Sequence, residues 1–124
     1  MPVVFSFMLY DQKFLFSLLL TLIVEIPIAV FFVRRFYKYK EIKISKIVFA
    51  GLIASVLTLP YFWFVLPVYI SSRSLYIFIG EVLIIFIEAI IYNQFLKLKL
   101  SNALIVSSVA NIASIFLGLI IQQI

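Results

Sequence analysis

The sequence predicts an all-α integral membrane protein, a four-helix bundle with short loops, and three observations carry this prediction. Of the 124 residues, 66% are apolar and only 12% are charged, whereas a soluble domain has about 45–50% apolar and ~25% charged residues. A chain of this size has too little interior to bury that excess. The apolar residues also fall into four long runs, and the basic residues lie between or beside these runs.

Each apolar run is close to the length of about 20 residues that a helix needs to cross the hydrocarbon core. The runs do not alternate polar and apolar residues as the strands of a membrane β-barrel do. The first run is long and contains Glu25 and Pro27, so we expect it to be a retained span and not a signal peptide. Within a single membrane domain of residues 1–124, we expect spans at residues 14–33, 47–70, 75–96 and 103–121.

The basic residues predict the orientation of the spans. Eight of them lie in the first and third connections, while only Lys13 and Arg73 lie on the opposite side. Cytoplasmic loops carry an excess of lysine and arginine, so both termini are expected on the extracytoplasmic side of the cell membrane.

The first connection forms a basic loop at the membrane surface. We expect its side chains to contact anionic lipid head groups, each gaining about 1 kcal/mol. The sequence has no phosphate-cradling glycine motif, and we expect no nucleic-acid partner. The basic residues of this loop are Arg34, Arg35, Lys38, Lys40, Lys43 and Lys46.

The absence of cysteine and histidine narrows the possible chemistry. It excludes disulfides, thiol nucleophiles, Cys/His zinc sites and imidazole acid–base catalysis. The serines inside the spans have no histidine or lysine beside them to activate the hydroxyl. We therefore expect no enzyme activity, no metal site and no cofactor.

Three acidic residues inside the spans are the candidates for function. An acid at the bilayer centre costs about 2.5–3.5 kcal/mol, so intramembrane carboxyl groups are functional candidates by default. Glu25 lies nine residues before Arg34, and Glu88 lies nine residues before Lys97. At 1.5 Å per residue, both carboxyl groups lie about 13–14 Å from the inner charged layer, near the midplane.

Two neutral polar residues are expected near the same level. Thr58 follows Lys46 by twelve residues and Asn111 follows Lys99 by twelve, which places both about 18 Å from the inner layer. Glu81 lies about 24 Å from that layer, in the outer third of the bilayer. We expect Glu25 and Glu88 to bind a proton or cation, with Thr58 and Asn111 as neutral ligands and Glu81 as an outer relay.

Small residues recur at intervals of four in the last span. Ala110, Ser114 and Gly118 form a row that lets another helix approach closely, and we expect it to serve helix packing.

The buried acids leave three alternatives open, because the spans contain no lysine or arginine. The acids can be protonated and hydrogen-bonded to Asn111, Thr58 or each other, in which case they simply hold the helices together. They can bind a cation or a metal, or they can meet a basic residue of a partner subunit. The leading hypothesis is proton- or cation-coupled transport or ion conduction, with the lipid-embedded chain acting as a homo-oligomer. The alternative is a non-catalytic accessory subunit of a larger membrane complex.

Overall fold

The computed structural model describes residues 9–36 and 41–121, and in that part of the chain the structure is helical. Four helical segments there are long and apolar enough to cross a membrane, with hydropathies of 2.0 to 2.5. This confirms the predicted all-α four-helix membrane fold. The elements are α1 (Tyr10–Phe31), the π-helical turn η2 (Phe32–Phe36), α2 (Ile44–Pro60), the π-helical turn η3 (Tyr61–Val65), α3 (Leu66–Tyr69), α4 (Arg73–Leu96) and α5 (Leu100–Ile121).

The helical segments begin two to four residues earlier than the apolar runs that predict them, at residues 10, 44, 73 and 100. The added residues are mostly polar or lie next to polar ones, as in the Tyr-Asp-Gln-Lys start of α1. A helix satisfies its own backbone hydrogen bonds, so it continues into the head-group region beyond the last apolar residue.

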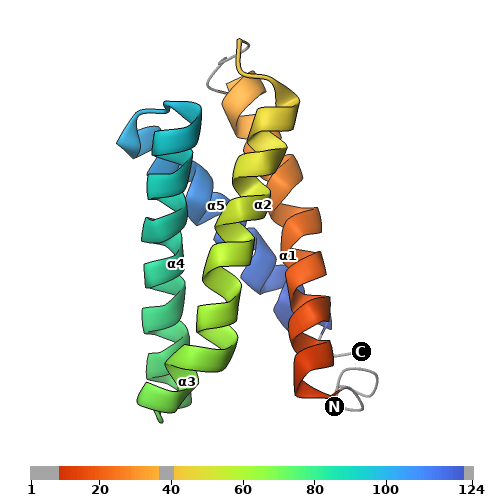
Figure 1. The fold of residues 1–124 in the computed structure, drawn as a ribbon, viewed down its shortest axis with the longest axis vertical. Helices are drawn as coiled ribbons and strands as arrows, with labels where there is room; N and C mark the ends of the chain where they lie inside the picture. Colours follow the sequence, from red (N-terminus) through yellow and green to blue (C-terminus); the bar gives the residue numbers. More distant parts are fainter. Residues whose placement is uncertain (1–8, 37–40, 122–124) are drawn as a thin grey trace.

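The four long helices form a ring in the order α1, α2, α4, α5, and α5 closes the ring by packing against α1. Figure 1 shows α5 crossing behind the other helices, beside α4 at one end of the bundle and beside α1 at the other. The two ends of the described chain lie at the same end of the bundle, together with α3. Their orientation relative to a membrane stays a prediction.

A tight turn joins α4 to α5 at the opposite end. Lys97 adopts a left-handed conformation, with φ 60° and ψ 29°, and ends α4. The Asn93 side chain donates a hydrogen bond of 2.6 Å to the carbonyl oxygen of Leu98. This bond ties the turn back to α4, so the two helices run antiparallel as neighbours.

The half of the bundle next to this turn contains the hydrophobic core, and we call it the core half. Its central residues are at most 2% exposed, and four of them are alanines, which allow the helix backbones to approach closely. These residues are Ala29, Val33, Ile47, Ala50, Ala89, Tyr92, Leu96, Leu98, Ala103 and Val106.

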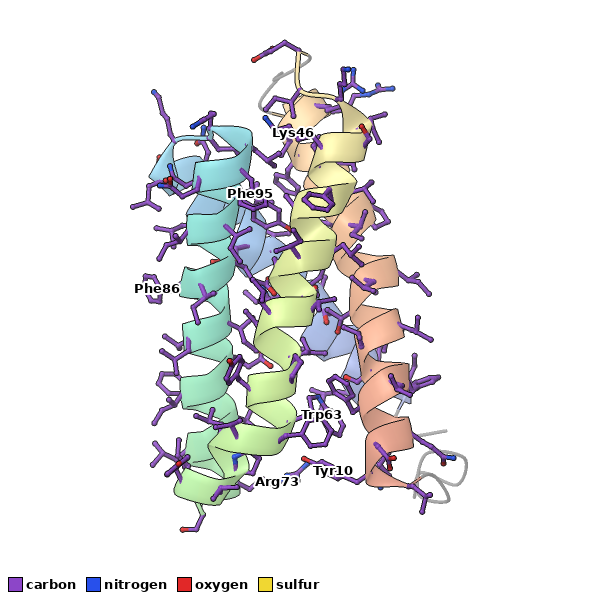
Figure 2. The ribbon with its side chains drawn as sticks, viewed as in Figure 1. Tyr10, Lys46, Trp63, Arg73, Phe86 and Phe95 are labelled. Atoms are coloured by element: carbon purple, nitrogen blue, oxygen red, sulfur yellow. The ribbon has the colours of Figure 1, made fainter. Side chains whose placement is uncertain are left out.

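The other half, which we call the terminal half because both ends of the described chain lie there (Figure 1), contains the π-helical turn η3 of the second span. Pro67 lacks a backbone N–H, so the carbonyl of Trp63, four residues earlier, loses its helical donor. The hydroxyl of Tyr10 on α1 donates to that carbonyl instead. The two rings also meet edge to face at 5.2 Å, and Figure 2 shows them side by side at this end of the bundle.

A second tyrosine holds the same segment from the other side. The hydroxyl of Tyr76 on α4 donates to the Phe62 carbonyl at 2.6 Å, and the two rings stack with centroids 4.8 Å apart. Phe62 packs directly over Gly80, where a Cβ would lie 2.3 Å from the phenyl ring. Gly80 is therefore required for this packing of η3 against α4.

Candidate functional site

Glu25 on α1 and Glu88 on α4 meet inside the bundle, where their side chains are 2% and 0% exposed. Their carboxyl groups lie within hydrogen-bonding reach of each other. An ionised carboxyl group has acceptor atoms only. A hydrogen bond between the two groups therefore requires a proton on at least one of them.

Glu88 receives a hydrogen bond from α5 through Asn111. The side-chain nitrogen of Asn111 donates to Glu88 Oε1 at 2.8 Å and to the carbonyl oxygen of Ser107 at 2.8 Å. A backbone carbonyl only accepts hydrogen bonds, so the contact with Ser107 fixes which end of the Asn111 amide faces Glu88. The Ser107 hydroxyl donates in turn to the Ile85 carbonyl at 2.8 Å, which ties α5 to α4 beside the pair.

The second oxygen of Glu88 faces α2. Thr58 Oγ1 lies 3.0 Å from Glu88 Oε2 and donates to the carbonyl oxygen of Ala54 at 2.7 Å. Each oxygen of Glu88 thus contacts a neutral polar side chain from a different helix.

Glu25 has its neutral neighbours on α1 and α5. The Ser114 hydroxyl lies within hydrogen-bonding reach of the Glu25 carboxyl group. Ser114 Oγ also lies 3.4 Å from Thr21 Oγ1, one helical turn before Glu25. Helix α5 therefore contacts both acids, through Asn111 and Ser114.

The structure brings together four of the five predicted ion-site residues, one from each long helix: Glu25, Thr58, Glu88 and Asn111. We refer to these four residues as the carboxyl cluster. Glu81 lies two turns from Glu88 on the same face of α4, toward the terminal half, and is half-buried. Among the described residues, no hydrogen bond joins Glu81 to the cluster. The ion-binding role of all five residues stays a prediction.

Sequence reasoning assigned no site role to two buried hydroxyl groups near the cluster. Within the described chain, Ser55 Oγ is the one buried side-chain polar atom without a hydrogen-bond partner, and Ser55 is 1% exposed. Tyr92, also 1% exposed, lies one turn from Glu88 on α4. The spacing of Gly51, Ser55 and Thr58 places all three on one face of α2, which is the signal that identifies Ser55.

The predicted packing row is used at only two of its three positions inside the bundle. Ala110 is fully buried, and Ser114 contacts Thr21. A Cβ added at Gly118 would meet nothing within 4 Å.

The predicted basic loop lies at the end of the core half. Arg34 and Arg35 belong to η2, and Lys43 and Lys46 lie at the start of α2, where they are exposed. Figure 2 shows Lys46 at this end and Arg73 at the opposite end. The two other residues of the basic loop, Lys38 and Lys40, lie outside the described residues.

Two apolar depressions lie on the outside of the bundle. A pocket of about 260 Å³ between η3 and α4 has Thr58 in its wall, together with Phe62 and Gly80. A wider groove of about 570 Å³ runs between α1 and α5, lined by Val24, Ile112 and Phe116 among others. In residues 9–36 and 41–121 the structure places no group of three or more acidic side chains that could hold a metal ion.

Comparison of the chain with protein-family models, with curated proteins and with solved structures found no match.

Proposed function

We propose that the protein is a small ion-coupled transporter or ion-conducting unit of the cell membrane, and that the Glu25–Glu88 pair binds its ion. The observation that supports this most directly is the meeting of two fully buried acids from different helices. Along their own helices, the nearest basic residues on the core-half side are Arg34 and Lys97, each nine residues away. At about 1.5 Å per residue, that distance is too long for an ion pair.

A comparison of free energies favours an ionisable role for the two acids over a purely structural one. Hydrogen bonds between membrane helices contribute about 0.6–2 kcal/mol each. An acid at the bilayer centre costs about 2.5–3.5 kcal/mol, so asparagine or serine would join the helices at lower cost. The pair also has no activated nucleophile beside it, since the sequence lacks cysteine and histidine. We therefore propose transport and not catalysis.

The proposed route has Glu81 on its outer side. Glu81 is half-buried and lies on the terminal-half side of the carboxyl cluster, so it can pass an ion or proton between the cluster and that end of the bundle. On the other side of the cluster, the core residues are at most 2% exposed. Passage across the membrane therefore requires either that the helices move or that a second copy of the chain forms part of the route. We propose the second solution, a homo-oligomer.

Ion flux in proteoliposomes tests the proposal. We expect the purified wild-type protein to carry an ion flux and both Glu25→Gln and Glu88→Gln to lose it, because glutamine keeps the shape but cannot ionise. Glu41→Gln, a change at an exposed acid in the basic connection, is the control and should keep the wild-type flux. Undiminished flux in both folded glutamine variants would contradict the proposal.

An accessory subunit is the second candidate, and the open surface of α5 favours it. Gly118 faces empty space, so a helix of a partner protein could approach α5 closely there. In this case a basic residue of the partner reaches the buried acids. Purification from the native membrane should then give a mass well above that of the 14.3 kDa chain or its dimer. Replacing an acid should abolish assembly.

A further inference from the structure

We propose that the ion held by the carboxyl cluster is a proton and not a metal cation, and that Thr58 is its hydrogen-bonding partner on α2. This inference rests on the proposed function, because it names the ion of the same site. The inference is drawn from the contacts of Glu88, because each contact requires a hydrogen atom at a particular position.

The first step concerns Glu88 Oε1. A metal ion bound there would attract the carbonyl oxygen of a neighbouring amide. The contact with the Ser107 carbonyl turns the Asn111 amide the other way, so an N–H points at Oε1. One lone pair of this oxygen therefore accepts from an N–H, and the Asn111 carbonyl oxygen, which a cation would attract, does not face it.

The second step concerns Glu88 Oε2. The hydroxyl of Thr58 has one hydrogen but two contacts, at 2.7 Å with the Ala54 carbonyl and at 3.0 Å with Oε2. One hydrogen cannot serve both at full strength. The shorter contact is with a carbonyl, which can only accept, so the hydrogen belongs there. A proton on Oε2 then donates to Thr58 Oγ1 and completes the second contact.

The third step concerns Glu25, whose contact with Glu88 also needs a hydrogen. With one proton on each acid, every contact of the cluster has its donor, and the pair is neutral. Release of one proton leaves a single negative charge. The remaining proton then lies between the two carboxyl groups, and the Thr58 hydrogen can turn from Ala54 toward Glu88. The site therefore has hydrogen-bonded arrangements for both protonation states.

The fourth step is the count of oxygen atoms left for a metal. Each Glu88 oxygen already contacts a neutral side chain, and the Thr58 hydroxyl is engaged with Ala54. The oxygen ligands that remain nearby are the free lone pairs of Glu88, the Glu25 carboxyl group and the unpartnered Ser55 hydroxyl, which lies on the same face of α2 as Thr58. Mg²⁺ takes six ligands and Ca²⁺ takes six to eight.

The groups around Glu88 do not balance the charge that proton release creates. Helix α1 contributes Glu25, α4 itself contributes Glu81 and Tyr92, and α2 and α5 face the site with neutral hydroxyl and amide groups. Each of the titratable groups is neutral or negative. Occupancy by a proton therefore changes the net charge of the site.

Infrared difference spectroscopy on the full chain in lipid nanodiscs tests this inference independently of transport. We expect a C=O stretching band of protonated carboxyl groups that weakens as pH rises and is unchanged by sodium, potassium or magnesium chloride. Glu88→Gln and Glu25→Gln should each reduce the band. Thr58→Val, which keeps the shape of threonine without the hydroxyl, should shift the band because the Glu88 proton loses its acceptor. Glu41→Gln should leave the band at wild-type strength and frequency.

Three results would overturn the inference: no protonated band at any pH at which the protein stays folded, displacement of the proton by a metal cation, or no shift in Thr58→Val. If Glu88→Gln does not fold, Glu25→Gln and Thr58→Val still decide the question. The proposed function fails separately. A pH-sensitive band without ion flux would contradict the transport proposal and support the proton site. Metal-dependent flux without such a band would support transport and contradict the proton site.

Discussion

The two halves of the bundle are built differently, and the carboxyl cluster lies at the boundary between them. In the core half, alanines and branched side chains pack to at most 2% exposure. In the terminal half, the second span changes to π-helical geometry at η3, tyrosine hydroxyls donate to the Phe62 and Trp63 carbonyls, and Glu81 stays half-buried. If the cluster binds an ion as proposed, the close packing of one half and the polar contacts of the other favour exchange of that ion through the terminal half.

The same difference predicts which half of the bundle resists rearrangement and which half opens locally. Tightly packed regions have few alternative arrangements, because removing or adding a methylene group there already costs free energy. A segment held by hydrogen bonds from two side chains can open locally at a smaller cost. We therefore expect α3 and η3 to open before the core half does.

The largest combined effect on stability and flux should come from a substitution in the carboxyl cluster, at the boundary between the two halves. Asn111→Leu removes the donor to Glu88 Oε1 and leaves a buried oxygen unpaired, so we expect a loss of about 1–3 kcal/mol in unfolding free energy. Flux should fall with it. Denaturant titration in detergent micelles measures the first and proteoliposome flux the second. Ser101→Leu, a change at an exposed position of the same helix, should affect neither. Equal stability of the two variants would show that the Asn111 contact is dispensable.

An effect of similar size on stability is expected from the first of three glycine-to-alanine changes in the two halves. Gly80→Ala places a Cβ 2.3 Å from the Phe62 ring, which forces Phe62 to move and should cost about 1–3 kcal/mol. Gly51→Ala approaches Ile26 at 3.0 Å and requires only a small adjustment. Gly118→Ala meets no atom within 4 Å and is the control. Thermal unfolding should rank the variants in this order, and a Gly51→Ala protein less stable than Gly80→Ala would reverse the comparison.

The smallest loss of stability is expected from two tyrosine-to-phenylalanine changes, and it should be confined to the terminal half. Tyr76→Phe leaves the Phe62 carbonyl without its donor, and Tyr10→Phe does the same for Trp63. Each loss should cost about 0.5–1.5 kcal/mol. Hydrogen exchange read by mass spectrometry should become faster in peptides covering η3 and α3 and stay unchanged in peptides covering residues 44–54. Equal acceleration in both regions would mean that the two halves open as one unit.

Much of the fold could be predicted, because the need to satisfy backbone groups inside lipid leaves few choices to an apolar chain. The common level of Glu25 and Glu88 could also be predicted, since the rise per residue of a helix is fixed. The capping of the Trp63 and Phe62 carbonyls could not, because Tyr10 and Tyr76 reach them from other helices. The second acceptor of Thr58 likewise depends on a rotamer, which spacing along the chain does not determine.

The diagonal course of α5 would link occupancy of the proposed site to the tilt of this helix. Asn111 and Ser114 are three residues apart on α5, and each contacts a different acid. Figure 1 shows this helix leaning from α4 toward α1 along its length. A change in its lean would lengthen one of these contacts while it shortens the other. Under the proposal of a proton site, gain or loss of a single proton would favour one tilt of α5 over another, and a change of charge would become a change in helix position.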